Sequence, residues 1–209
     1  MPMDISLLHH PIAQNLLTRL RQKSTSPIEF RNLVRQLTIF LGLDATRDLP
    51  TVPHTIQTPM TTCSGPVLES SIAIVPILRA GIGMAEPLFE MMPHAVVRHL
   101  GLFRDEETLQ PVTYYEKLPG GHIPDVCLVV DPMLATGGTA IAAVELLRGW
   151  GAQDIRFLGI LGAPEGVAAL QKAHPEVRIH LAGLDERLNE HGYIMPGLGD
   201  AGDRQYNTL

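Results

Sequence analysis

Apolar residues along the chain fall into two alternating patterns, and the alternation predicts an α/β fold. Near-continuous apolar runs at 71–78, 126–130, 154–161 and 177–182 are typical of strands buried on both faces of a parallel sheet, and 95–103 is also strand-like. Helical spacing of apolar residues follows at 83–92, 140–150 and 164–173. We therefore expect a mostly parallel sheet flanked by helices, with ligands at the carboxyl ends of its strands.

The first fifty residues predict helices rather than strands. Residues 11–21 place Ile12, Leu16, Leu17 and Leu20 on one face, and Ser26-Pro27-Ile28-Glu29 is a capping box that opens a second helix. These helices either pack on the core or supply a dimer surface, and the pattern alone allows both.

Three further segments differ from the regular alternation. Residues 52–59 predict a strand or an extended arm. Residues 105–124 are polar between turn signals, which indicates a hairpin or mobile flap over a site. Residues 192–206 are rich in glycine and predict an irregular segment with interleaved apolar side chains.

The stretch 126–139 carries the clearest chemical signal. A buried strand ends at Asp131, and the loop Ala135-Thr136-Gly137-Gly138-Thr139 leads into a helix. Glycines let the backbone approach a ligand, and amides at a helix N-terminus attract anions, so the loop predicts a phosphate cradle. Asp131 is placed to accept hydrogen bonds from sugar hydroxyls. An ordinary glycine-rich strand-to-helix turn is the alternative interpretation.

Composition narrows the class of protein. The 209 residues suit one domain with appendages, and the net charge of −6 gives no basic footprint for nucleic acid. Cys63 and Cys127 form neither a disulfide framework nor a zinc motif. We find no signal peptide and no apolar run long enough for a membrane helix, so we expect a cytoplasmic protein without a membrane partner.

Other motifs are weaker. The string Gly197-x-Gly199-x-x-Gly202 matches a dinucleotide fingerprint, but no strand-to-helix unit can follow it before the sequence ends. The chain has no Gly-Lys dipeptide, which excludes a Walker loop. Cys63 as a thiol nucleophile is a further weak alternative. Arg79 and Arg104 follow predicted strands, as Asp131 does, so all three can converge at one edge of the sheet.

Four ordered stretches together resemble the uracil phosphoribosyltransferases, a type I phosphoribosyltransferase family. They are 45–50 (Ala-Thr-Arg-Asp-Leu-Pro), 76–84, 130–139 and 193–204, and the likeness extends along nearly the whole chain. The resemblance implies that uracil and 5-phosphoribosyl 1-pyrophosphate (PRPP) give UMP and pyrophosphate, a pyrimidine salvage reaction. Type I members often carry two adjacent acids at this strand end, whereas this chain has Asp131-Pro132 and so a single carboxylate.

The resemblance also implies roles for individual residues. Catalysis would rest on Asp131, Arg79, Arg104 and Asp200, and uracil would be held by Ile194, Gly199, Asp200 and Ala201. PRPP would be bound by Arg79, Arg104, Asp131, Pro132, Met133, Leu134, Ala135, Thr136, Gly137, Gly138, Thr139 and Asp200. Mg²⁺ is the implied cofactor, with Asp200 near it through PRPP or water.

Several questions stay open at the level of sequence. The resemblance implies a GTP effector and a homo-oligomer of dimer or higher order, and it divides one domain of residues 1–209 into helices 1–50, a flap hairpin 105–124 and a base-binding segment 183–209. Asp200 and Asp203 are also common turn formers. A phosphoribosyltransferase for another base, and a PRPP-sensing RNA regulator with a basic face, are the alternative functions.

Overall fold

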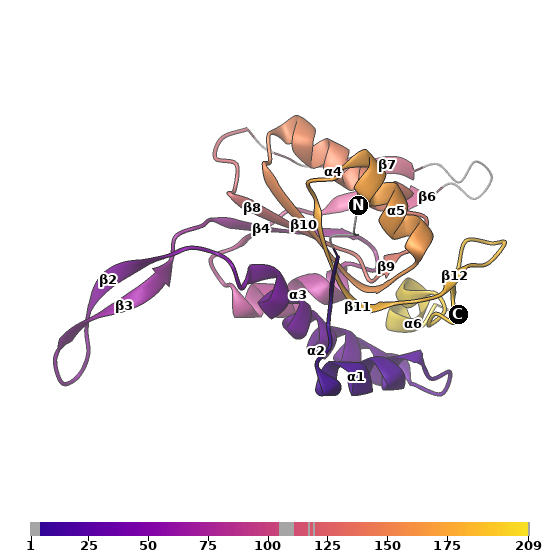
Figure 1. Cartoon of the computed structure of the whole chain (residues 1–209), viewed down its shortest axis with the longest axis horizontal. Helices are drawn as coiled ribbons and strands as arrows, with labels where there is room; N and C mark the ends of the chain where they lie inside the picture. The colour runs from indigo at the N-terminus through magenta and orange to yellow at the C-terminus, as the bar shows by residue number, and fades with distance from the viewer. Residues whose placement is uncertain (1–4, 105–110, 117, 119, 209) are drawn as a thin grey trace.

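The computed structural model describes residues 5–104, 111–116, 118 and 120–208, and Figure 1 shows their arrangement around one central sheet. The sheet runs in the order β1, β11, β10, β8, β4, β6, β7; β5 also pairs with β4, and β9 with β10. Within this sheet, the described strands all pair in parallel except β6 with β7. The strands are β1 (Ile5–Leu7), β4 (Ile72–Leu78), β5 (Val96–Val97), β6 (Leu100–Arg104), β7 (Pro111–Glu116), β8 (Val126–Val130), β9 (Met133–Leu134), β10 (Asp154–Gly162) and β11 (Arg178–Leu184). The expected mostly parallel sheet is confirmed.

Helices cover both faces of the sheet, which gives three layers. Helices α1 (Pro11–Arg21), α2 (Pro27–Thr46) and α3 (Ile82–Met91) lie on one face, and α4 (Gly138–Trp150) and α5 (Pro164–Ala173) lie on the other (Figure 1). Strand β4 shows why both faces are needed: Ile72 and Ile74 pack in the first apolar cluster, whereas Ala73 and Val75 pack in the second. None of the described helices is both long and apolar enough to cross a bilayer.

The N-terminal helices pack on the core. Ser26 caps α2 as its sequence predicts, with its hydroxyl accepting a hydrogen bond from the Glu29 amide at 3.3 Å. The apolar stripe of α2 is buried along its length, from Phe30 through Leu37 to Ala45. This stripe faces the sheet and α3, so the core-packing interpretation holds for the buried side of α2.

An extended hairpin projects from the globular body. Among the described strands, β2 (Thr51–Gln57) and β3 (Thr62–Leu68) pair only with each other, in register from Thr51–Leu68 to Gln57–Thr62. The expected arm at 52–59 is therefore present, but its partner strand was missed. Except for Gly65, every residue of the two strands is exposed, and Figure 1 shows the arm standing clear of the sheet.

Other expectations need correction. The single strand expected at 95–103 is two short strands, β5 and β6, which both pair with β4 at different heights. The segment 192–206 is less irregular than expected, because it contains β13 (Ile194–Met195) and α6 (Ala201–Tyr206); β12 (Arg187–Leu188) precedes it. Of the expected flap, β7 pairs antiparallel with β6, and residues 105–110, 117 and 119 lie outside the described part of the chain.

Candidate active site

The loop after β8 is fixed by hydrogen bonds to the neighbouring strand. The amides of Ile160 and Leu161 donate to the Pro132 carbonyl at 3.0 and 2.9 Å, and the Ala163 amide donates to the Leu134 carbonyl at 3.0 Å. Strand β9 extends the pairing of β10 beyond the end of β8. The start of the loop, at 132–134, is therefore held against β10, and this support suits the anion-binding role proposed for the residues that follow.

Two glycines bring this loop against α5. Gly137 precedes α4 with φ of 85°, and a Cβ there would lie 2.8 Å from the Gly166 carbonyl oxygen. A Cβ on Gly166 would in turn collide with the Ala135 carbonyl oxygen and lie 2.7 Å from that of Leu134. A side chain at position 137 would thus point at α5. Glycine at this position lets the loop turn and pack against that helix.

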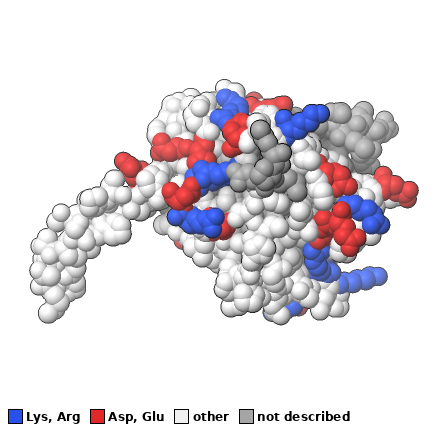
Figure 2. Space-filling model, in the orientation of Figure 1, with Lys and Arg blue, Asp and Glu red and all other residues white. Residues whose placement is uncertain are grey.

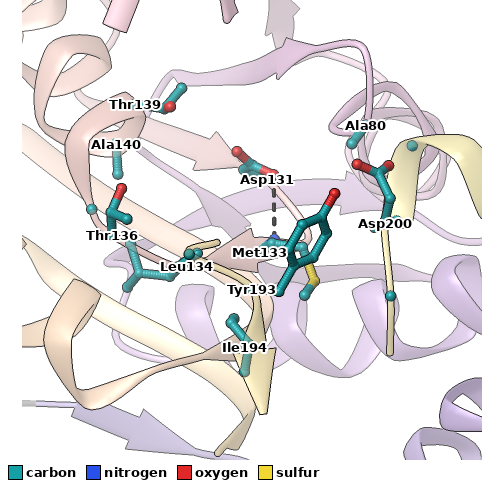
Figure 3. Close-up of a pocket in the computed structure, with 16 residues that line it drawn as sticks. Ala80, Asp131, Met133, Leu134, Thr136, Thr139, Ala140, Tyr193, Ile194 and Asp200 are labelled. Atoms are coloured by element: carbon teal, nitrogen blue, oxygen red, sulfur yellow. Dashed lines mark hydrogen bonds between the residues drawn. The ribbon is translucent and has the colours of Figure 1, made fainter. Parts of the chain in front are cut away.

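The loop forms one side of a pocket of about 250 Å³ (Figure 3). The other side comes from the C-terminal segment, more than fifty residues further along the chain. The predicted residues that line the pocket are Asp131, Met133, Leu134, Ala135, Thr136, Gly137, Thr139, Ile194, Gly199, Asp200 and Ala201. Ala80, Ala140, Gly192, Tyr193 and Gly202 complete the lining, whereas Pro132, Gly138 and Arg79 do not belong to it.

Asp131 lines this pocket, and its surroundings disfavour the charged form of its carboxyl group. Burial raises the pKa of its carboxyl to about 7, and the nearby Asp200 carboxylate adds to the rise, while the Met133 amide, 3.3 Å from Oδ1, opposes it. Figure 3 shows the two carboxylates at opposite sides of the Tyr193 ring. The pocket therefore favours a ligand that brings positive charge or hydrogen-bond donors to Asp131.

Asp200 both lines the pocket and caps a helix. Its Oδ1 accepts a hydrogen bond from the Asp203 amide at 2.8 Å, which starts α6. The turn-forming interpretation and the site interpretation of Asp200 are compatible, since one carboxylate oxygen caps the helix while the residue faces the pocket.

Helix α6 also holds the loop that follows β4. The Gln205 side-chain amide donates to the Ala80 carbonyl at 3.1 Å, and the Tyr206 hydroxyl donates to the Arg79 carbonyl at 3.3 Å. The Arg79 side chain is 61% exposed and lies 3.4 Å from an Asp203 oxygen. Its Nη2 lies 4.0 Å from the Cβ position of Gly202, so the guanidinium is next to the pocket lining.

Arg104 ends β6, whose neighbour in the sheet is β4. Its side chain lies outside the described residues, so its expected role stays a prediction.

Tyr193 is a pocket residue that the sequence analysis did not predict. Its ring stands in the pocket in Figure 3, next to the predicted Ile194. Its place at the start of a family-like stretch was the available signal.

The described residues include no group of three or more His, Cys, Asp or Glu side chains that would hold a metal. Asp131 and Asp200 nevertheless suit Mg²⁺, because this ion is commonly held by one or two carboxylates together with substrate phosphates and water. The Asp200 carboxylate adds to the cost of ionising Asp131, as the raised pKa of Asp131 shows, and a cation bound near Asp131 would lower that cost.

The thiol alternative has little support from the geometry. Cys127 is buried in β8, and burial raises its pKa to about 12, which disfavours the thiolate. Cys63 lies exposed on β3 of the arm and is not part of the pocket lining.

Comparisons with known proteins agree along nearly the whole chain. The family model described as uracil phosphoribosyltransferase matches residues 7–208. A uracil phosphoribosyltransferase of Roseiflexus sp. (strain RS-1) is 53% identical over 205 residues, which cover 98% of this chain and 99% of the relative. The solved structure of the AQ2163 protein from Aquifex aeolicus superposes with a TM-score of 0.90 at 34% identity, covering 97% of each chain.

A more distant structure shows the fold alone. Adenine phosphoribosyltransferase from Leishmania donovani has a TM-score of 0.59 at 14% identity, covering 92% of this chain and 88% of that one. The parallel sheet, the loop after β8 and these matches lead to one conclusion. The chain belongs to the uracil phosphoribosyltransferase family.

Proposed function

We propose that this enzyme transfers the phosphoribosyl group of PRPP to N1 of uracil and releases UMP and pyrophosphate, a step of pyrimidine salvage. One observation supports the assignment of the site: a single pocket joins the phosphate-type loop after β8 to the glycine-rich backbone at 194–201. A nucleotide-forming enzyme needs both subsites within bonding distance, so that base and sugar meet.

The loop is proposed to hold the ribose 5-phosphate. Amides at the start of α4 and the hydroxyls of Thr136 and Thr139 supply donors to an anion, and both threonines line the pocket. Asp131 would accept hydrogen bonds from the ribose hydroxyls. The proposed PRPP set remains Arg79, Arg104, residues 131–139 and Asp200, as the family resemblance implies.

Positive charge at C1′ and negative charge on the leaving group develop together in this reaction. Asp131, once ionised, would stabilise the oxocarbenium-like ribose. Arg79 and Arg104 would stabilise the departing pyrophosphate. Mg²⁺, when bound with PRPP near Asp131 and Asp200, would neutralise phosphate charge. No covalent intermediate is required, because uracil N1 bonds to C1′ directly while the C1′–O bond to pyrophosphate breaks and N1 loses its proton.

The base is proposed to be read by backbone groups around Ile194 and Gly199 to Ala201. Uracil presents acceptor, donor and acceptor along one edge, whereas cytosine reverses two of these positions. Backbone N–H and C=O groups held in place discriminate well, since each stranded buried group costs about 1–3 kcal/mol. Gly199, with φ of 81°, gives this backbone a conformation that other residues rarely adopt.

We also propose a homo-oligomer, a dimer or higher, in which the β2–β3 arm contacts another copy. An isolated two-stranded hairpin is at best marginally stable in water, and this arm exposes apolar side chains including Val52, Ile56 and Met60. Cytoplasmic location and a GTP effector stay predictions from sequence and family resemblance.

A base panel tests the function. Uracil, cytosine, orotate and hypoxanthine are incubated separately with PRPP and Mg²⁺, and nucleotide and pyrophosphate are quantified. We expect turnover with uracil and negligible turnover with cytosine. Faster turnover with another base would favour the alternative phosphoribosyltransferase. Tight RNA binding at moderate salt, without turnover of any base, would favour the regulator; the face shown in Figure 2 mixes charges of both signs.

A further inference from the structure

The turn between the two pocket-lining parts of the C-terminal segment is held by an ion pair that lies outside the pocket. Asp185 follows β11, and its side chain is only 5% exposed. Its Oδ2 accepts a hydrogen bond from the Gly197 amide at 2.8 Å. The Arg21 guanidinium, at the end of α1, binds both carboxylate oxygens of Asp185 and donates to the Gly197 carbonyl at 2.9 Å.

Gly197 is therefore fixed at both of its backbone polar groups. Its φ is 67°, and a Cβ there would collide with the carbonyl oxygen of Ile194. This close approach sets the distance between Ile194 and the residues that follow the turn. Ile194 and Gly199, on either side of Gly197, both line the pocket.

A second arginine holds the next peptide. Arg204, from α6, donates to the Leu198 carbonyl at 2.7 Å and to the Leu20 carbonyl at 3.0 Å, and its guanidinium stacks 4.5 Å from the Phe30 ring centroid. The end of α1 thus contacts the C-terminal turn through two independent arginines. Neither Arg21, Asp185 nor Arg204 lines the pocket.

We propose that Arg21 and Asp185 are positioning residues for base recognition, which hold the backbone of Ile194 and Gly199 in the register that reads uracil. The inference rests on the proposed function, because it assigns the supports of the proposed uracil subsite. A planar arginine bound bidentately to a carboxylate fixes direction as well as distance. Backbone reading needs such a support, since glycines at 197 and 199 leave the free segment flexible.

The effect should fall on the base and not on PRPP. The phosphate loop is held separately by β10 and α5, through the Pro132 and Leu134 carbonyls and the contact at Gly166. Loosening the turn at Gly197 should therefore leave that loop in place, while the pattern of donors and acceptors offered to uracil becomes less defined.

The experiment compares Arg21→Ala, Arg21→Lys and Asp185→Asn with wild type. We expect Arg21→Ala to raise KM for uracil at least tenfold and change KM for PRPP less than twofold. The ratio of kcat/KM for uracil to that for cytosine should also fall at least tenfold. Arg21→Lys should recover part of both losses, and Asp185→Asn should share the uracil defect.

The matched control is Arg19→Ala, which removes another ion pair of α1, the exposed bond of Arg19 to Glu29 at 2.6 Å. It should leave both Michaelis constants unchanged. Thermal unfolding of each variant identifies loss through misfolding. Equal rises in both Michaelis constants, or an unchanged uracil constant in folded Arg21→Ala, would overturn the inference. Wild type inactive with uracil would overturn the proposed function instead, so the two failures are distinct.

Discussion

At the residue scale, Arg79 is a charged side chain that lies exposed beside the pocket. Its side chain is 61% exposed, and among the described residues its ion pair is the 3.4 Å contact to Asp203, so the guanidinium is available to an incoming phosphate. Arginine presents a planar fork to two oxygens, which lysine cannot do. We therefore expect Arg79→Ala to lower kcat/KM for PRPP by one to two decades, with charge-assisted bonds contributing roughly 1.5–3 kcal/mol each.

Arg79→Lys should fall between wild type and the alanine variant in steady-state assays. Arg35→Ala is the control, since Arg35 pairs with Glu86 and Glu90 on the surface of α2 and α3. A lysine variant equal to wild type would mean that charge alone suffices at position 79.

Asp131 should link activity to pH-dependent stability. Its carboxyl pKa is raised from 3.8 to about 7 in the folded chain. As pH rises, the unfolded chain therefore loses this proton before the folded chain does. As pH rises from about 4 to 7, the folded state is destabilised, by at most about 4 kcal/mol at 1.36 kcal/mol per pKa unit. Below pH 4 both states are protonated and the effect disappears.

Asp131→Asn removes this titration. In the absence of ligand we expect the variant to unfold at a higher temperature than wild type at pH 8, and at a similar temperature at pH 4. Its kcat/KM with uracil and PRPP should nevertheless fall by one to two decades, because the proposed contact of Asp131 with the ribose hydroxyls would be lost. Calorimetric scans at the two pH values measure the first effect. A variant less stable than wild type at pH 8 would contradict it.

Site residues that follow one another in the sequence could be predicted from it. Residues that reach the site only through contacts between distant segments could not. Asp131 and the loop to Thr139 are recognisable because strand, carboxylate, glycines and threonines follow one another directly. Gly166 and Gln205 give no such signal, since their roles arise only when α5 and α6 fold against loops from other parts of the chain.

At the scale of elements, the contact between α5 and the phosphate-type loop invites a test with two helical glycines. A Cβ on Gly166 would collide with the Ala135 carbonyl, whereas a Cβ on Gly149 in α4 has nothing within 4 Å. Gly166→Ala should lower the unfolding temperature and raise KM for PRPP, because the loop must move away from α5. Gly149→Ala should stabilise the fold by about 0.5–1 kcal/mol.

Both effects are measured by thermal unfolding and by PRPP saturation curves. If Gly166→Ala unfolds like Gly149→Ala and keeps the wild-type KM for PRPP, the close contact is not needed for the site. In the same contact, a Cβ on Gly137 would face the Gly166 carbonyl oxygen, so Gly137 also lets the loop close on α5.

Strands buried on both faces were predicted correctly from their apolar runs. The exposed strand β3 and the short helix α6 lack such a pattern and were missed. Strands β4, β8, β10 and β11 are buried, so their apolar runs identify them. Strand β3 is exposed and contains Gly65 and Pro66, which hide its strand character. Helix α6 has only six residues and depends on the Asp200 cap and on contacts to other loops.

At the scale of the whole molecule, the β2–β3 arm is exposed to solvent and does not pack on the sheet. From residue 51 to residue 68 it has no Lys, Arg, Asp or Glu, and Figure 2 shows it as an uncharged projection beside a body that carries both signs. Its apolar side chains are open to solvent, with Ile56 at 43% and Met60 at 92% exposure. Uncharged strand edges of this kind invite pairing or packing with another chain.

We therefore expect Ile56→Asp to weaken self-association. A stable interface buries roughly 800 Å² per partner, and a charge at its apolar centre must be desolvated without a partner. Sedimentation velocity at micromolar concentration should show a dimer or larger species for wild type and a shift toward monomer for the variant. The control is Ile12→Asp on α1, an isoleucine with 57% exposure outside the arm, which should keep the wild-type species. A monomeric wild type would contradict the oligomer itself, whereas an unshifted Ile56→Asp would exclude only the arm as its interface.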